Sequence, residues 1–204
     1  MSKPQLYGIA SSRAFRSIWA AEEIGLDYEH VATSFRGDAQ ALEYLAVNPN
    51  GRIPALVDGD LRLFESMAIN MYLAKKYGPT LLPADAAGEA QVWQWSVWAI
   101  SEIEPQQMAM VIQQFFTSEE KRDAEVTQRA SSALARPFGV LNSHLSQQDY
   151  LLGDEFTIAD LNLSGVMDLL NMLNYDLSGF PEVQAWVKRC YARPSYAAAK
   201  QVGS

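Results

Sequence analysis

Hydrophobic residues recur with two different periods in the first part of the chain. Short apolar runs over residues 5–9 and 28–33 predict strands. Residues 12–24 carry apolar side chains at helical spacing, and Gly25 follows, where a helix C-terminus favours glycine. Residues 39–47 predict a short helix, because the turn-forming run Asn48-Pro49-Asn50-Gly51 comes directly after them.

The stretch GRIPALVDGDLRLFESMAI over residues 51–69 predicts a β-hairpin and the start of a helix. Its two strands are expected near residues 53–57 and 61–64, with the turn at Asp58-Gly59. Ser66 is expected to cap a helix over residues 67–77, which Gly78 ends. The predicted order of strands and helices is therefore βαβαββα.

The pattern changes after residue 78. Residues 79–88 are rich in Pro, Ala, Gly and Asp, a composition typical of a linker. No strand pattern follows, and helical periodicity covers residues 89–114, 119–147, 157–173 and 181–192. We therefore expect an α/β domain over residues 1–78, a linker over residues 79–88 and an all-helical domain over residues 89–204.

The most specific local signal is the start of the helix after residue 156. Thr157 fits the N-cap position, and Asp160 stands three residues later, as in a capping box. Phe156 and Leu161 occupy the two positions of a hydrophobic staple. The segment predicts a firmly specified helix start rather than a catalytic site.

Composition excludes several classes of function. The chain has 204 residues, 49% hydrophobic and 20% charged, as in a soluble globular protein. Its net charge of −8 would repel a nucleic acid backbone. No apolar stretch is long enough for a membrane span and the start MSKPQ lacks the apolar core of a signal peptide, so we expect no membrane association and a cytoplasmic location.

Cysteine and histidine are scarce. Cys190 is the single cysteine, so redox chemistry by the chain's own thiols is not expected. The two histidines, His30 and His144, stand far apart and have no companion at the spacing of metal ligands. We therefore expect no metal.

The hairpin segment has features that suit a peptide ligand. A proline at the start of a strand implies an edge strand or an unusual peptide bond at Pro54, with the backbone groups of Ile53 free to pair with an extended peptide. Ser66 at a helix N-terminus could bind a carboxylate, and Glu65 an ammonium. A γ-glutamyl peptide carries all three features. Alternatively, Ser66 is only an N-cap and Glu65 only a first-turn partner of the helix dipole.

The run NPNGRIPALVDGDLRLFESMAINMYLAKKYG resembles the glutathione-binding segment of the glutathione transferase superfamily. The opening LYGIASSRAFRSIWAAEEIGLDYE, the segment LLGDEFTIADL and the closing Trp186 with Arg193 to Ser195 extend the resemblance over nearly the whole chain. It implies a thioredoxin-like N-terminal domain with a mixed four-stranded sheet, an all-helical C-terminal domain and a two-fold homodimer. It also implies that Pro54 is cis, that Ile53 pairs with the cysteinyl unit of glutathione, and that Glu65 and Ser66 hold the γ-glutamyl end.

The resemblance also implies which residue activates the thiol of glutathione. Ser11 falls where the serine-type theta, zeta and phi classes carry their activating serine, and Ser12 would be a helix cap or a second donor. Lowering a thiol pKa of about 8.5 by two units needs roughly 2.7 kcal/mol, which a charge-assisted hydrogen bond and a helix N-terminus can supply. Alternatively, both hydroxyls only cap the helix.

Two departures from the family pattern concern neighbouring positions. Ala39 and Gln40 stand where phi-class proteins use histidine and lysine for the glycine carboxylate of glutathione. Arg52 is then the better candidate, since guanidinium pairs bidentately with carboxylate, with Arg36 and the amide of Gln40 as further donors.

Arg13 replaces the cysteine that zeta-class proteins carry after the two serines. The chain also has no cysteine where the cysteine-type omega and beta classes place their mixed-disulfide thiol. These departures disfavour deglutathionylation by a cysteine of the protein and isomerisation of the maleylacetoacetate kind. Arg13 would bind an acidic co-substrate or would simply be solvated.

The second substrate is expected to be a hydrophobic electrophile. Aromatic and methionine side chains adapt to varied apolar ligands, although the same residues at helical spacing also suit a plain core. The expected residues are Ile9, Ala10, Arg13, Trp98, Met108 and Phe115.

The function predicted on these grounds is that of a glutathione S-transferase in detoxification, with glutathione as co-substrate. Peroxidase, dehalogenase, ether-cleaving or isomerase chemistry would use the same site. The alternative of another class is a non-catalytic interaction protein that keeps only the fold, because fold does not fix function.

Overall fold

The computed structural model describes residues 3–203, and these form two compact units. Of the described residues, the first unit comprises 3–84 together with 191–203, and the second comprises 85–190. The boundary after Ala84 falls inside the expected linker. The assignment of the last residues differs from the expectation that residues 89–204 form one domain.

A four-stranded mixed sheet is the centre of the first unit. Its strands are β1 (Gln5–Gly8), β2 (Glu29–Ala32), β3 (Ala55–Asp58) and β4 (Leu61–Phe64), in the order β2-β1-β3-β4. β1 runs parallel to β2 and antiparallel to β3, and β3 pairs antiparallel with β4. The predicted thioredoxin-like sheet is confirmed, and the strand that Pro54 precedes is interior rather than an edge.

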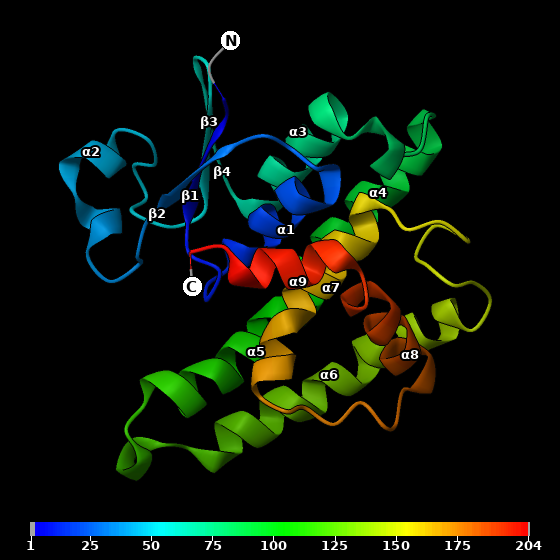
Figure 1. Cartoon of the computed structure of the whole chain (residues 1–204). Helices are drawn as coiled ribbons and strands as arrows, with labels where there is room; N and C mark the ends of the chain where they lie inside the picture. The colour runs from blue at the N-terminus through cyan, green and yellow to red at the C-terminus, as the bar shows by residue number, and fades with distance from the viewer. Residues whose placement is uncertain (1–2, 204) are drawn as a thin grey trace. The chain divides into compact units, whose positions relative to one another are not determined.

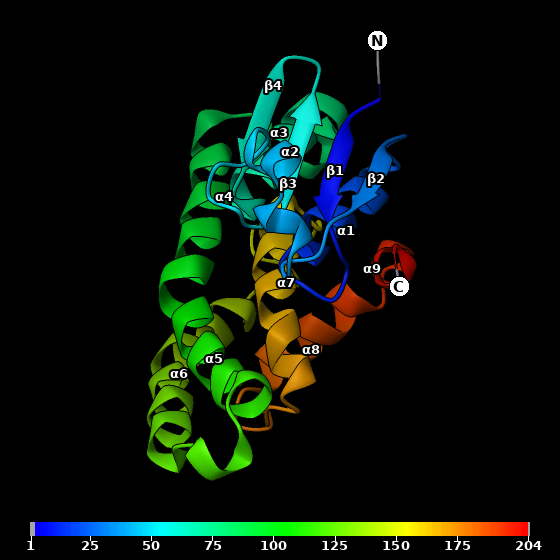
Figure 2. The same cartoon turned by 90° about the vertical axis from the view of Figure 1, so that its left-hand side faces the viewer.

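Helices cover both faces of this sheet. The helices α1 (Phe15–Ile24) and α3 (Ser66–Tyr77) lie on one face, and the short α2 (Leu42–Leu45) lies on the other (Figures 1 and 2). The expected helix over residues 39–47 is divided, because Ala41 is extended between the 3₁₀ turn η1 (Asp38–Gln40) and α2. A second 3₁₀ turn, η2 (Pro79–Leu81), follows α3.

The turn of the hairpin is fastened to the last turns of α3. Oδ2 of Asp58 accepts hydrogen bonds from the hydroxyls of Tyr72 and Tyr77 and from Nζ of Lys76, each at 2.7 Å. Nζ of Lys76 also lies 4.8 Å from the ring centroid of Tyr77. The hydrogen bonds therefore fix the β3-β4 turn against the end of α3.

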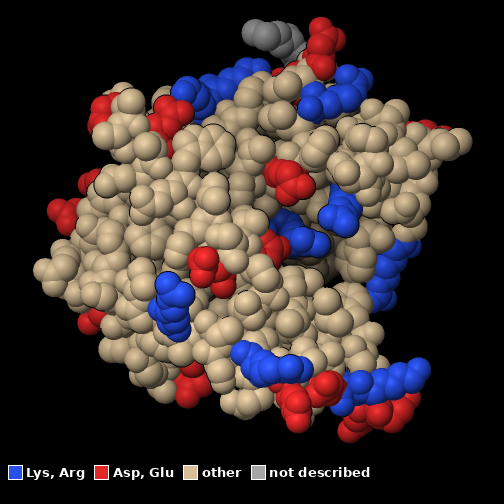
Figure 3. Space-filling view, turned by 180° about the vertical axis from the view of Figure 1, so that it is seen from behind, with Lys and Arg blue, Asp and Glu red and all other residues tan. Residues whose placement is uncertain are grey.

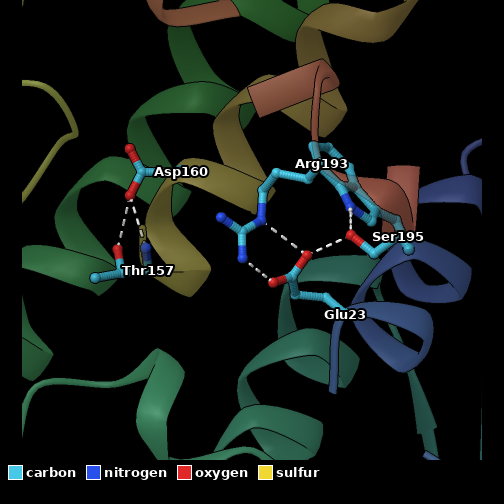
Figure 4. Close-up of polar contacts among 6 residues, drawn as sticks. Glu23, Thr157, Asp160, Arg193 and Ser195 are labelled. Carbon is cyan, nitrogen blue, oxygen red and sulfur yellow. Dashed lines mark hydrogen bonds and ion pairs between the residues drawn. The ribbon is translucent and has the colours of Figure 1, made fainter. Parts of the chain in front are cut away.

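The last residues of the chain pack against α1. Helix α9 (Pro194–Gln201) follows Arg193, which forms a bidentate ion pair with Glu23, and Glu23 also accepts a hydrogen bond from Ser195 (Figure 4). Trp19 Nε1 donates to Ser195 Oγ at 3.0 Å. The helical pattern up to residue 192 did not predict α9, whose short alanine-rich sequence has a weak amphipathic pattern.

α-Helices and shorter helical turns make up the described secondary structure of the second unit, apart from one isolated bridge between Tyr150 and Gly153. A continuous helical stretch combines α4 (Ala86–Trp98), the π-helical segment η3 (Ala99–Ile103), α5 (Glu104–Val111) and a second π-helical segment, η4 (Ile112–Phe116). Pro105 has no N–H to donate to the preceding turn, which accounts for the altered hydrogen bonding at η3. The remaining elements are η5 (Glu119–Lys121), α6 (Ala124–Leu145), α7 (Ile158–Met172) and α8 (Pro181–Tyr191).

The predicted capping box at the start of α7 is present. The backbone N–H and the hydroxyl of Thr157 both donate to Oδ2 of Asp160, at 2.9 and 3.0 Å (Figure 4). Oδ1 of Asp160 accepts hydrogen bonds from Trp186 Nε1 and from the backbone N–H of Leu151. Burial raises the pKa of this carboxyl, although these hydrogen bonds act in the opposite direction. Asp160 therefore ties α7 to α8 and to the loop before α7.

Candidate active site at one end of the sheet

Three segments that the sequence singled out meet at one end of the sheet. In the antiparallel pairs, Tyr7 lies opposite Ala55, and Ala55 lies opposite Phe64. The residues after β1, before β3 and after β4 therefore leave the sheet at the same end. A Cβ built on Gly8 would lie 3.6 Å from Cβ of Ile53, which places the first two segments in contact. We call this region the open end of the sheet.

The two serines after β1 are in different states. Ser12 Oγ donates to the carbonyl of Ile9 at 2.7 Å and accepts from the N–H of Ala14 at 3.1 Å. Ser11 is exposed, and its hydroxyl makes no hydrogen bond to another residue in the described range 3–203. Ser12 thus stabilises the turn before α1, while the proton of Ser11 remains available to a ligand. Helix α1 begins at Phe15 rather than at Ser12.

The segment before β3 presents free backbone groups. The peptide bond between Ile53 and Pro54 is cis, as the resemblance implied. The carbonyl of Arg52 accepts hydrogen bonds from the hydroxyl of Tyr44 at 2.5 Å and from the amide of Asn48 at 2.6 Å. The backbone N–H and carbonyl of Ile53 have no backbone partner among the described residues. These two groups can therefore pair with an extended peptide.

The polar side chains near Gly51 differ in their availability. Gln40 Nε2 donates to the carbonyl of Gly51 at 2.9 Å, so one of the amide's hydrogens supports the turn instead of facing a ligand. Arg52 is exposed and has no ion pair with another residue of the described chain. Arg36 is exposed beside the ring of Phe35. Of the cations predicted for the glycine carboxylate, Arg52 is next to Ile53 in the chain.

Glu65 and Ser66 occupy the beginning of α3 in a different way from the prediction. Glu65 takes the N-cap position, and Ser66 is the first helical residue, so the expectation that Ser66 caps the helix is wrong. Glu65 has φ of 70°, which a residue other than glycine rarely adopts. Its side chain is exposed, and only 7% of Ser66 is exposed. No side chain within residues 3–203 caps the first N–H groups of α3, so these groups could bind a ligand.

The residues predicted for the electrophile belong to both units. In the first unit, Ile9 and Ala10 are half-buried and Arg13 is exposed, all in the loop after β1. The other three lie on the continuous helix of the second unit: Trp98 at the end of α4, packed edge-on against Trp95 at 5.3 Å between ring centroids; Met108 in α5, half-buried; and Phe115 in η4, 47% exposed.

Further features of the described chain concern metal sites, membrane-spanning helices and patches of basic residues. Among residues 3–203 no group of three or more His, Cys, Asp or Glu is arranged to hold a metal ion. No helix within this range is long and apolar enough to cross a membrane. On the face drawn in Figure 3, Lys and Arg side chains form small separate groups among Asp and Glu.

Sequence reasoning missed the residues that support the site. Tyr44 and Asn48 hold the carbonyl of Arg52, and His30 contacts the carbonyl of Gly8 at 2.8 Å. The run around Asn48 was assigned only a turn. In the structure only 1% of Asn48 is exposed, and a buried amide needs hydrogen-bond partners, but the sequence does not show this burial.

Comparisons with known proteins show which family the chain resembles. The family model for the N-terminal domain of glutathione S-transferases matches residues 2–75, and the model for their C-terminal domain matches residues 105–194. Glutathione S-transferase 3 of Zea mays is 36% identical over 207 residues, which cover 96% of this chain and 92% of the relative.

Two solved structures are similar over nearly the whole chain. One is glutathione S-transferase-I bound with lactoylglutathione, with a TM-score of 0.88 and 32% identity, covering 98% of this chain and 99% of that one. The other is a glutathione transferase of Burkholderia graminis with two glutathione molecules per subunit, with a TM-score of 0.91 and 30% identity, covering 100% of this chain and 89% of that one. The chain therefore belongs to the glutathione S-transferase family.

Proposed function

We propose that this protein binds glutathione at the open end of the sheet and that Ser11 stabilises its thiolate for attack on a hydrophobic electrophile. The observation that carries the proposal is the difference between the two serines. The hydroxyl of Ser12 donates its hydrogen bond to the carbonyl of Ile9, whereas the exposed hydroxyl of Ser11 has no partner among the described residues. A hydroxyl without a partner at this position can donate a charge-assisted hydrogen bond to a thiolate.

The peptide backbone of glutathione would pair with Ile53. The free N–H and carbonyl of Ile53 have the character of a strand edge, which recognises an extended peptide through main-chain hydrogen bonds. Tyr44 and Asn48 support this segment by holding the adjacent carbonyl of Arg52. The cysteinyl unit would thereby be placed between Ile53 and the loop that carries Ser11.

The two charged ends of glutathione would be held by different groups. The γ-glutamyl carboxylate would bind at the start of α3, at the uncapped N–H groups and the hydroxyl of Ser66, and Glu65 would attract the ammonium. The glycine carboxylate would pair with the guanidinium of Arg52. Gln40 would act mainly through the turn at Gly51 that it supports.

Catalysis would follow from thiolate stabilisation and proximity. Glutathione supplies the nucleophilic sulfur, so the protein needs neither a cysteine nor a general base with a matched pKa. The sulfur would attack the electrophilic carbon and displace a leaving group or add to an activated double bond. The protein contributes by holding the thiolate next to its target.

We propose that the exposed apolar side chains of η4, in the second unit, contribute to binding of the electrophile. Phe115 and Phe116 are 47% and 56% exposed, which provides apolar surface for a ligand. A panel of halides, activated alkenes, epoxides and peroxides would separate conjugation from reductive or isomerising chemistry at the same sulfur.

We also propose a cytoplasmic homodimer that acts in detoxification. Trp93, Val97 and Ile100 are 42%, 59% and 37% exposed. Their spacing places them along one face of the α4–η3 helix, the kind of stripe that a second helix covers. Sedimentation at two concentrations of the wild type and of Val97→Glu would test the dimer. A monomeric wild type would contradict it.

The thiolate mechanism is tested by titrating the bound thiol. The ultraviolet absorbance of the thiolate is measured against pH for complexes of glutathione with the wild type, Ser11→Ala and Ser12→Ala. We expect Ser11→Ala to raise the pKa of the bound thiol by about two units and to lower kcat/KM roughly 50-fold near neutral pH. Ser12→Ala is the matched control, because it removes a hydroxyl that is already engaged, and should mainly lower stability by about 1 kcal/mol. A larger pKa change in Ser12→Ala than in Ser11→Ala would contradict the assignment.

A further inference from the structure

The loop that carries Ser11 is closed by a tight contact between its two ends. Gly8 ends β1 and Ala14 precedes α1. A Cβ built on Gly8 would lie only 2.2 Å from Cβ of Ala14, so the backbone of Gly8 lies against the side chain of Ala14. A displacement of Gly8 would therefore displace Ala14, and residues 9–13 between them would change position.

The side chain of His30 holds the carbonyl of Gly8. His30 belongs to β2, where its backbone partner in the register is Leu6, and its Nε2 lies 2.8 Å from the Gly8 oxygen. A carbonyl oxygen only accepts, so Nε2 carries the hydrogen and donates it. The N–H of Thr33 reaches the same oxygen at 3.4 Å, a longer and weaker contact. His30 thus supplies the shorter of the two hydrogen bonds on this carbonyl.

The end of the chain holds the imidazole of His30 in place. Gly203 has φ of +63°, and a Cβ built there would lie 2.5 Å from Cε1 of His30. The glycine therefore lies directly against the ring, and a larger residue there would require the ring to shift. The segment that carries Gly203 is fastened to α1 by the ion pair between Arg193 and Glu23.

We propose that His30 is a positioning residue for Ser11: it fixes Gly8, the entry of the serine loop, and thereby directs the Ser11 hydroxyl at the thiol of glutathione. The inference rests on the proposed role of Ser11. A hydrogen bond weakens steeply when its angle departs from linearity, so a small rotation of the loop lowers the stabilisation of the thiolate. Ser12 fixes the interior of the same loop, and His30 fixes its entry.

The test compares His30→Leu with His30→Gln. Glutamine places an N–H donor the same number of bonds from Cα as Nε2 of histidine, whereas leucine fills similar space without a donor. We expect His30→Leu to raise the pKa of the bound thiol by about one unit and to lower kcat/KM about three- to tenfold. His30→Gln should keep a thiol pKa and a kcat/KM close to those of the wild type.

Val31→Ala is the control on the same strand, because Val31 lies opposite Tyr7, not Gly8. The pKa of the glutathione thiol bound to this variant should stay unchanged.

Gly203→Ala provides a second, independent variant. It keeps the imidazole as a donor but shifts the ring, so we expect a smaller rise of the thiol pKa than in His30→Leu. The melting temperature is recorded for every variant. This variant keeps the inference testable if His30→Leu does not fold.

Ser11→Ala, measured in the same series, separates this inference from the proposed function. If Ser11→Ala raises the thiol pKa and both His30→Leu and Gly203→Ala leave it unchanged, the role of His30 is overturned and the role of Ser11 stands. If Ser11→Ala has no effect, both are overturned. Equal losses in His30→Gln and His30→Leu would also overturn the inference, because the donor would then not matter.

Discussion

The two ends of the sheet in the first unit differ in whether their polar groups have hydrogen-bond partners. At the hairpin turn, one carboxylate oxygen of Asp58 accepts three hydrogen bonds, from Tyr72, Tyr77 and Lys76. At the open end, the hydroxyl of Ser11 and the backbone groups of Ile53 have no partners among the described residues. The polar groups at the hairpin turn are satisfied by other residues, whereas those at the open end have hydrogen-bonding capacity that a ligand could use.

Positive φ values show the same contrast. Gly59 in the hairpin turn has φ of 61°, which glycine adopts without a steric penalty. Glu65 at the open end has φ of 70°, although it carries a side chain. A residue held in such a conformation typically costs about 1–3 kcal/mol, and such residues cluster at ligand sites. The open end therefore combines unsatisfied groups with backbone strain.

The largest expected effect comes from adding a side chain at Gly8, which is in tight contact with Ala14 at the open end. Gly8→Ala places a methyl group 2.2 Å from Cβ of Ala14, at a residue with φ of +143°. We expect a loss of about 3 kcal/mol or more in the free energy of unfolding, together with loss of glutathione turnover. Urea unfolding measures the first effect and a conjugation assay the second.

The double variant Gly8→Ala/Ala14→Gly separates the effect of the steric clash with Ala14 from the effect of the positive φ at residue 8. It removes the clash but keeps the positive φ, so stability should recover only in part. Wild-type stability in Gly8→Ala alone would show that the contact is not tight.

A smaller effect is expected at the hairpin turn. Asp58→Ala removes the acceptor shared by Tyr72, Tyr77 and Lys76, and should lower the free energy of unfolding by about 2 kcal/mol. Because the open end keeps its own contacts, the thiol pKa of bound glutathione should stay at the wild-type value in the folded fraction. A shift of that pKa would mean that the two ends are coupled.

The same carboxylate gives the hairpin turn a pH dependence. Burial raises the pKa of Asp58, but the hydrogen bonds from Lys76, Tyr72 and Tyr77 outweigh it, so the pKa is lowered. Its stabilisation is thus complete above the unfolded-state pKa of about 3.9 and is lost as the pH falls through the folded-state pKa. The difference in stability between the wild type and Asp58→Asn should shrink on acidification below about pH 4. A difference that stays constant down to pH 2 would contradict this assignment.

The smallest expected effect separates strain from binding at Glu65. Glu65→Gly should raise the free energy of unfolding by about 1 kcal/mol, because glycine tolerates the positive φ. It should also weaken glutathione binding through loss of the carboxylate. Glu65→Ala is the matched control: it loses the same carboxylate but keeps the strain. Calorimetric titration and thermal unfolding of both variants check this, and equal stabilities would argue against strain at this residue.

Much of the fold could be predicted from local sequence. The hairpin was predicted from two short apolar runs joined at Asp58-Gly59, and the start of α7 from the spacing of Thr157 and Asp160, because both patterns act over a few residues. Helix α9 was missed, since it depends on packing of Tyr196 against Trp19, with ring centroids 5.2 Å apart across a large separation in sequence. The division of residues 39–47 was missed for the same kind of reason: the break at Ala41 lies beside a turn held by Gln40.

For the candidate site too, some features could be predicted from the sequence and others depended on the tertiary structure. The residues of the hairpin segment indicated Ile53, Glu65 and Ser66 as candidates, and the resemblance to the family implied Ser11 and Ser12. The sequence could not say which serine has a free hydroxyl, because that depends on where the carbonyl of Ile9 and the N–H of Ala14 lie in three dimensions. Nor did it reveal His30, whose contact with Gly8 exists only because β1 and β2 are parallel neighbours.

The sequence by itself predicted most of the helices and strands, the family resemblance and the candidate residues, because periodicity, capping and motif order depend on residues that are close together in the chain. The tertiary structure decided that β3 is an interior strand, that Ser66 begins α3 without capping it, and that residues 191–203 belong to the first unit. It also decided which of the described polar groups have hydrogen-bond partners and which have none. Hydrogen bonds and close contacts join residues that are distant in the chain, and only the folded backbone brings those partners within reach.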